Sequence, residues 1–296
     1  MKKIVLIILA LVLAISLIAC NNTEAVEEDG AGVADYAKPI REHSVEMVIG
    51  SETVTVGTLT YEDGVGDTAT ITKYVGLFTA HPTKIDSNVG EGISARVVTK
   101  IGDEAFYYCT AITSIELPET LTSIGDWAFA GCTGIETIVI PAEVTSIGKG
   151  AFNGCTNLKS VIFEEGSKLK SIDDYAFNDC TSLETITIPE GVESIGAKAF
   201  GGCEKITSIK TPASLQSIGD LAFYGCTGLN AEGALDVSAS VNIAIKVENI
   251  GGEKIETVCI GKYVFAGIKK DYIIVPEDAE CEMAKYVAAM RDTAEE

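Results

Sequence analysis

The stretch Val144-Thr-Ser-Ile-Gly-Lys-Gly-Ala-Phe-Asn-Gly-Cys155-Thr-Asn-Leu-Lys-Ser-Val-Ile162 decides the fold, because the chain repeats it. Six segments begin with Ile-Gly or Ile-Asp and run to a cysteine, and each carries Ala-Phe at the same offset. These cysteines follow one another at intervals of 23, 23, 25, 23 and 23 residues: Cys109, Cys132, Cys155, Cys180, Cys203 and Cys226. A fixed period of roughly 20–50 residues is typical of a solenoid, in which each repeat stacks on the next.

An aliphatic triplet that alternates with period two follows each cysteine, as in Ile138-Val-Ile140-Pro141. Such a triplet predicts a short strand with two side chains inward and one outward, and proline ends the strand. One strand cannot bury its own apolar face, so we expect the copies to stack as a parallel sheet with strands about 4.8 Å apart. We expect the Ala-Phe-x-x-Cys stretch to form a short helical or 3-10 turn on the opposite wall. The third copy carries two extra residues near Glu164-Glu165-Gly166.

The repeat resembles the BspA-like class of bacterial leucine-rich repeats, with six close copies over residues 98–230. The resemblance implies a leucine-rich-repeat solenoid of short parallel strands joined by short helical turns. A looser last copy covers 260–276, with Ile268 in the place of the cysteine. An insertion over 231–259 precedes it. Alternation in Val241–Val247 predicts a strand or hairpin there, with a turn at Gly251-Gly252.

Both flanks read as caps, because an open stack would expose apolar ends. Alternating segments in 45–97, such as Thr53-Val-Thr-Val56, predict an N-terminal β-hairpin cap. Residues 277–296 predict a C-terminal helix, since Met283, Val287 and Met290 recur at helical spacing.

The N-terminus reads as a targeting segment. Residues 1–19 combine a short basic start with an apolar run, which is typical of a signal peptide. The end of that run, Leu17-Ile-Ala-Cys20, resembles the bacterial lipobox, which implies cleavage before Cys20 and lipid attachment to it. An ordinary signal peptide with a chance cysteine is the alternative. Residues 20–44 are rich in acids and small residues, so they predict a solvated tether.

Composition and charge exclude several classes of function. The chain has 296 residues with 22 Lys plus Arg against 43 Asp plus Glu, a net charge of −21. This excess of acidic residues argues against nucleic acid as the partner, and against binding to anionic lipid through a polybasic segment. The chain has two histidines, His43 and His81, and no catalytic motif, so we expect neither an enzyme nor a cofactor. We interpret the six repeat cysteines as a buried ladder; disulfide pairs or a metal site are the alternatives, and Cys259 and Cys281 stay unassigned.

Two outward rows of the sheet are the candidate binding face. The row just upstream of the triplets contains Ser114, Thr137, Ser160, Thr185 and Ser208, and the middle row contains Glu116, Val139, Ile162, Thr187 and Lys210. The candidate aromatic contacts near Ala-Phe are Tyr107, Trp127, Tyr175 and Tyr224. These positions could equally be a solvated strand surface and turn packing.

Together with the resemblance, these rows indicate a lipid-anchored, cell-surface module for protein binding or adhesion. Its partner would be a host, matrix or neighbouring-cell protein, or a glycan, and the lipid would be its only contact with the membrane. The alternative is a glycan-binding or structural envelope lipoprotein.

Overall fold

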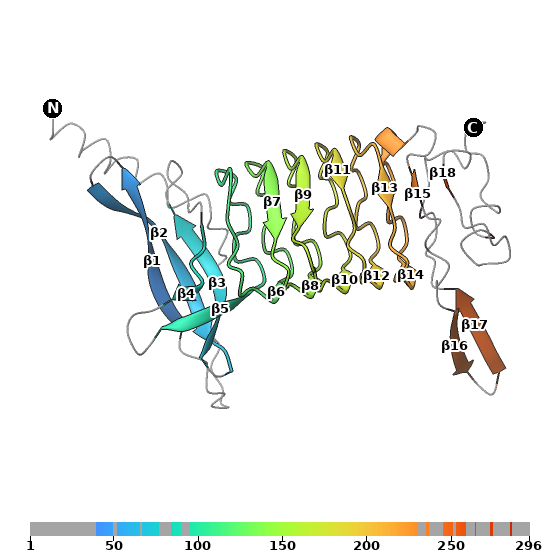
Figure 1. Ribbon diagram of the computed structural model, residues 1–296, viewed down its shortest axis with the longest axis horizontal. Helices are drawn as coiled ribbons and strands as arrows, with labels where there is room; N and C mark the ends of the chain where they lie inside the picture. Colours follow the sequence, from blue (N-terminus) through green and yellow to red (C-terminus); the bar gives the residue numbers. More distant parts are fainter. Residues whose placement is uncertain are drawn as a thin grey trace, which may run out of the picture.

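The chain folds into a stack of coils that continues a sheet at its N-terminal end (Figure 1). The computed structural model describes residues 40–49, 52–65, 67–76, 84–89, 95–229, 235–236, 245–250 and 253–258, together with 264, 273–274 and 285. The predicted leucine-rich-repeat solenoid is confirmed, and its coils follow the repeats read from the sequence.

One wall of the solenoid is a parallel sheet made of Ser-Ile pairs. Each coil adds one two-residue strand in register with the last: β6 (Ser123–Ile124), β8 (Ser146–Ile147), β10 (Ser171–Ile172), β12 (Ser194–Ile195) and β14 (Ser217–Ile218). The isoleucines point into the core and the serines are half-buried. The sequence predicted one strand per coil, whereas the structure has two, because the Ser-Ile dipeptide becomes a strand only by bonding to its neighbours.

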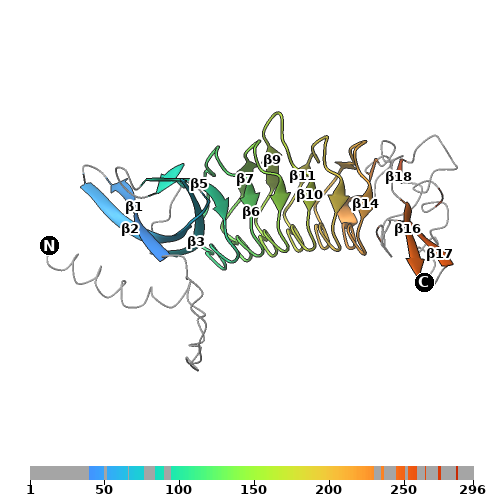
Figure 2. The same ribbon diagram turned by 90° about the horizontal axis from the view of Figure 1, so that it is seen from below.

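The second wall carries the predicted aliphatic triplets. β7 (Thr137–Ile140), β9 (Ser160–Phe163) and β11 (Thr185–Ile186) form a three-stranded parallel sheet. β13 (Ile209–Lys210) continues this row, but it belongs to a separate sheet with β15 (Leu235–Asp236) and β18 (Ile273–Ile274). Figure 2 shows the row from a second direction, with the loop after β9 standing out from its neighbours.

The third wall, which holds Ala-Phe, is a run of hydrogen-bonded turns and not a continuous helix. Each coil places two residues, four apart, in the left-handed region, for example Trp127 at φ 55° and Gly131 at φ 70°. A helix requires consecutive right-handed residues, so these positions interrupt it. The freed amides bond to the next coil instead: Trp127, Phe129 and Gly131 donate to the carbonyls of Lys149, Ala151 and Asn153. The 3-10 helix among the described residues is η2 (Thr227–Leu229).

The core consists of ladders, one side chain per coil. The phenylalanine rings are fully buried and stack with centroids 4.9–5.6 Å apart and planes within 8° of parallel. They are Phe106, Phe129, Phe152, Phe177, Phe200 and Phe223. Each Ala before them and each repeat Cys is buried as well. Full burial of every inward position is the reason a unit this short can fold at all.

The N-terminal cap continues the Ser-Ile sheet. β1 (Ile40–Ile49), β2 (Glu52–Asp63) and β3 (Thr68–Gly76) are antiparallel, and β3 runs parallel to β5 (Arg96–Ile101), which pairs with β6. β4 (Asn88–Val89) also pairs with β5, and this pairing is antiparallel. Strand structure therefore begins inside 20–44, where the sequence predicted a tether.

Tyr74 explains how the cap closes the stack. Its ring lies on Phe106 with centroids 5.6 Å apart, and its N–H donates to the carbonyl of Ala105. The tyrosine thus takes the place of one more phenylalanine, which covers the apolar end of the ladder.

The C-terminal part places its strands differently from the prediction. β15 pairs in register with β13 and β18, so it is the outer strand of the sixth coil, although the sequence assigned 231–259 to an insertion. β16 (Ile245–Ile250) and β17 (Glu253–Val258) form an antiparallel pair that ends with Ile250 opposite Glu253, and Gly251-Gly252, where a turn was predicted, lies outside the described residues. Val264 is buried and accepts a hydrogen bond from Phe223 N–H, as Ala222 does from Phe200. Of the predicted helix over 277–296, the structure describes Lys285 alone, as helical, and the rest lies outside the described residues.

Candidate binding face

The apolar pair Val139 and Ile162 lies at the centre of the triplet wall. The two residues face each other in the register of β7 and β9, and their exposed fractions are 41% and 47%. Their neighbours Ile138 and Val161 are buried, because side chains alternate across a strand. Two large aliphatic side chains therefore lie together on the outer surface of the sheet.

The other predicted face residues surround this pair. Thr137, Ser160 and Thr185 are aligned across β7, β9 and β11, so the predicted Ser/Thr row exists there. Ser160 is half-buried, whereas Ser114, Thr137, Thr185, Thr187 and Ser208 are exposed. We call the row from Ser114 to Ser208, together with Val139, Ile162 and Thr187, the binding face.

The ends of the middle row differ from its centre. Glu116 is exposed and forms an isolated parallel bridge with Lys84. Lys84 belongs to the N-terminal cap, which the sequence did not predict to lie beside this row. Lys210 is exposed in β13 and lies opposite Asp236 of β15, in the separate C-terminal sheet. The outer surface of the triplet wall is thus continuous across β7, β9 and β11, which form one sheet.

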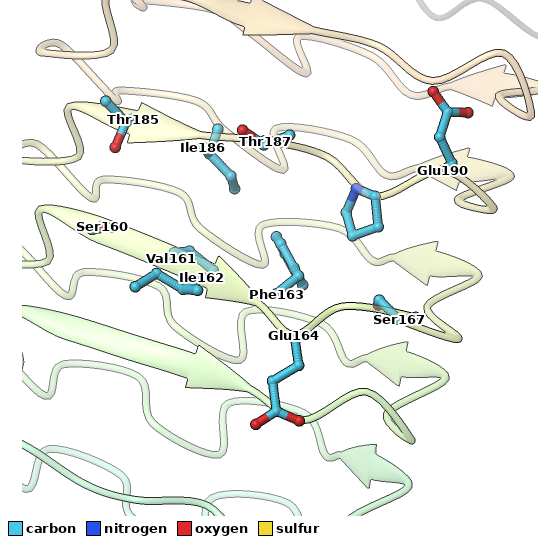
Figure 3. A pocket seen from close by; sticks show the side chains of 12 residues that line it. Ser160, Val161, Ile162, Phe163, Glu164, Ser167, Thr185, Ile186, Thr187 and Glu190 are labelled. Carbon is cyan, nitrogen blue, oxygen red and sulfur yellow. The ribbon is translucent and has the colours of Figure 1, made fainter.

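A hollow of about 570 Å³ opens on this face between the coils of β9 and β11. It is lined by Ser160, Ile162 and Phe163 of β9, by Thr185 and Ile186 of β11, and by Glu164 and Glu190, whose carboxylates accept hydrogen bonds from the coils on either side, at Ala142 and Ala213. Figure 3 shows Glu164 directed towards the preceding coil and Glu190 on the other side of Phe163. We call this the β9–β11 hollow.

The two extra residues of the third coil explain the hollow. In the first, second, fourth and fifth coils a proline follows the outer strand or triplet, but here Phe163 leads into a longer loop that includes Gly166 at φ 77° with open space around it. The loop is anchored to the preceding coil, since Glu164 N–H donates to the carbonyl of Ile140 and Lys168 N–H to that of Ala142. The sequence contained the signal, the 25-residue interval, but not its consequence for Phe163, Glu164 and Glu190.

The predicted aromatic contacts do not form one cluster. Tyr107 is exposed in the first coil, where its ring meets that of Tyr108 edge-on at 4.5 Å, and Tyr224 is exposed in the sixth. Although the side chain is exposed, partial desolvation, followed by the nearby Tyr108, raises the pKa of Tyr107. Trp127 and Tyr175 are half-buried in the turn wall. The Trp127 ring covers Gly150 so closely that a Cβ there would overlap it, so its role includes packing between coils.

The repeat cysteines form the predicted ladder of buried thiols, and none of the six is in a disulfide. From the second coil on, each thiol donates to the phenylalanine carbonyl of the coil before, as Cys155 Sγ does to Phe129 at 3.2 Å. Burial raises the pKa of Cys155 to about 12, against a smaller lowering by its backbone hydrogen bond. A thiol held protonated in this way is a poor nucleophile and a poor metal ligand.

The part of the chain that the structure describes offers neither a metal site nor a membrane span. Among its residues, no group of three or more His, Cys, Asp or Glu side chains is arranged to hold a metal ion. No helix among them has the length and apolarity needed to span a membrane. Cys20, Cys259, Cys281 and His81 lie outside the described residues.

A stack of coils with an outward strand row and an inward aliphatic, phenylalanine and cysteine core defines a leucine-rich-repeat solenoid. Residues 98–230 match the family model described as the BspA type leucine rich repeat region, with six copies. No curated protein matches the chain.

Two solved structures are similar. One is a leucine rich cell surface protein from Faecalibacterium prausnitzii A2-165, at 27% identity and a TM-score of 0.51, over 72% of this chain and 58% of that one. The other is a leucine rich repeat protein of T. pallidum, at 25% identity and a TM-score of 0.59, over 78% of this chain and 92% of that one. The chain thus covers little more than half of the first protein.

Proposed function

We propose that this chain is a surface-displayed, lipid-anchored module that binds another protein through its binding face. The observation that carries the proposal is the exposed pair Val139 and Ile162, aligned on adjacent strands in the middle of a polar row. Apolar side chains grouped on an outer surface are typical of contact sites, and solenoids use extended faces of this kind. The leucine-rich-repeat fold favours binding over catalysis as the function.

The structural relatives support display at the surface. The similar Faecalibacterium protein is described as a cell surface protein. In this chain the lipobox-like Leu17-Ile-Ala-Cys20 provides the means of attachment, with the acids that follow keeping the solenoid away from the membrane. Adhesion to a host, matrix or neighbouring-cell protein is the role that we propose for such a module.

Replacing both apolar residues, Val139→Asp together with Ile162→Asp, tests the face. The side chains are about half exposed, so the solenoid should stay folded while saturable binding to extracellular-matrix and cell-surface proteins is lost. The matched control is Asn157→Asp together with Gln216→Asp, which adds the same charge at exposed loop positions. Protein binding that survives the first pair, or binding to glycans alone that falls on Tyr224→Ala, would refute the proposal.

The anchor is tested separately. Cys20→Ser should abolish lipid attachment and the globomycin-sensitive processing of the precursor. If the wild-type chain is processed without lipid on Cys20, the module is displayed or released by another route.

A further inference from the structure

Two exposed tyrosines of the first coil form an aromatic corner on the turn wall. The rings of Tyr107 and Tyr108 lie with centroids 4.5 Å apart and planes at 83°, and the two side chains are 39% and 55% exposed. We call this pair the Tyr107–Tyr108 corner. It belongs to the wall that holds Ala-Phe, so it is separate from the binding face on the triplet wall.

The ring of Tyr108 lies over the next coil and leaves one face open. A Cβ added to Gly131 would be 2.8–3.0 Å from three adjacent ring atoms of Tyr108, namely Cγ, Cδ1 and Cε1. Such similar distances to three neighbouring atoms place that point above the face of the ring and not beyond its edge. Because the side chain is still more than half exposed, the opposite face is open to solvent, and Tyr107 stands at nearly a right angle to it.

The corner attracts positive charge. The face of an aromatic ring is the negative end of its quadrupole. Glu104 adds a full charge from the same turn, where it is exposed and its carbonyl accepts from Tyr107 N–H at 3.0 Å. Desolvation, then Tyr108 and then the charge of Glu104 raise the pKa of Tyr107, so this carboxylate acts on the corner. Among the residues that the structure describes, Glu104 has no ion pair with a lysine or arginine.

Elsewhere on the same wall, a cation of the chain already lies over a tyrosine. Lys198 Nζ is 5.8 Å from the ring centroid of Tyr175, which stands one repeat earlier. One repeat after Tyr108 stands Gly131, which has no side chain to offer. Within the described part of the chain, no lysine or arginine lies over either ring of the Tyr107–Tyr108 corner. The cation that complements this corner must therefore come from outside.

The right angle between the rings selects the shape of that cation. A planar guanidinium stacks on one ring at a time, and a primary ammonium holds its water strongly. A trimethylammonium group is rounded and weakly hydrated, so its methyl groups can contact the open face of Tyr108 and the ring of Tyr107 together. An attached phosphate would be repelled by Glu104 and by a chain with a net charge of −21.

We propose that the Tyr107–Tyr108 corner binds a small quaternary ammonium cation of the choline type that carries no anionic group. The two rings supply the cation–π contacts and Glu104 supplies the counter-charge. This site lies on a different wall from the binding face and does not depend on the proposed protein-binding function.

Calorimetric titration of the full chain with choline is the first test. The control ligand is the neutral isostere of choline, in which a tert-butyl group replaces the trimethylammonium group. We expect choline to bind saturably and the isostere to bind about tenfold more weakly, because only the charged ligand gains the attraction of both rings. Phosphocholine should also bind more weakly than choline. Equal affinities for choline and the isostere, or equally tight binding of acetylarginine amide, would overturn the proposal.

Variants locate the site. Tyr107→Leu together with Tyr108→Leu should lower the affinity for choline about tenfold, whereas Tyr107→Phe together with Tyr108→Phe keeps both rings and should bind as the wild type does. Glu104→Gln should cost about threefold, and less at high salt. The matched control is Tyr224→Leu, which removes a tyrosine that is 52% exposed on the same wall in the sixth coil and should leave binding unchanged.

Circular dichroism checks that the double leucine variant folds. If it does not fold, Tyr107→Leu alone carries the same expectation, with a loss of about threefold for one ring. Choline binding that survives the loss of the rings, or that falls as much in Tyr224→Leu, would place the cation elsewhere and refute the assignment.

Discussion

The stacked phenylalanines can be tested by replacing Phe152 with Ala. Phe152 is fully buried and lies between Phe129 and Phe177, with ring centroids 5.3 Å away on both sides and planes within 4° of parallel. Deleting a buried phenylalanine ring costs about 3–5 kcal/mol, and each aromatic pair contributes about 0.5–1.5 kcal/mol beyond its burial. Since the ring has two such partners, we expect a loss near the upper end, about 4–5 kcal/mol.

Equilibrium unfolding in urea measures this loss. The chain has one tryptophan, Trp127, in the coil before Phe152, so its fluorescence reports the unfolding of the coils around Phe152. Phe152→Leu, which keeps most of the volume but no ring, should lose markedly less stability. A double-mutant cycle of Phe152 with Phe177 should show coupling, whereas Phe106 with Phe177, separated by two coils, should be additive.

Two outcomes would refute this reasoning. If Phe152→Ala costs less than about 1 kcal/mol, the ladder does not hold the coils together in the way the burial indicates. If Phe106 and Phe177 are coupled as strongly as Phe152 and Phe177, the stack does not behave as a chain of nearest-neighbour contacts.

Two further predictions concern the thiols and the turn wall. Because burial raises the pKa of Cys155 and Cys226 from 9.0 to about 12, the unfolded chain loses these protons first as the pH rises. The stability that each contributes is therefore complete below pH 9 and should fall between pH 9 and 12, by roughly 1 kcal/mol per pH unit and thiol, and urea titrations of Cys155→Ala should show a shallower decline. In the turn wall, Gly150→Ala should cost more than Gly154→Ala, because both glycines are left-handed but only at Gly150 would a Cβ meet the Trp127 ring. That difference in unfolding free energy should shrink in a Trp127→Ala background, followed by circular dichroism, and an undiminished difference would contradict the assigned contact.

The repeat could be recognised from the sequence because the buried Ala, Phe and Cys recur in all six close copies. Each copy has the same Phe, Ala and Cys, so the ladders and the outward positions of Val139 and Ile162 were predicted and observed. When the apolar positions recur at a fixed period, stacking the repeats in register buries all of them against their neighbours.

The binding face was predicted only in outline. The alternation of Ile138-Val-Ile140 shows which side chain points outward, since that is a local property of a strand. The hollow depends on how the enlarged loop after β9 packs on the preceding coil. That packing joins residues about one repeat apart, and no local pattern reports it.

The sequence by itself determined the period, the inward ladders and the position of the outward row, whereas after Val241 it left a strand and a hairpin as alternatives. The tertiary structure alone decided that Ser-Ile pairs such as Ser146–Ile147 are strands, that the turn wall alternates left-handed residues, that β15 completes the sixth coil and that Tyr74 closes the phenylalanine stack. The reason is physical: a two-residue strand has no periodicity of its own, and it exists only through hydrogen bonds to coils more than twenty residues away.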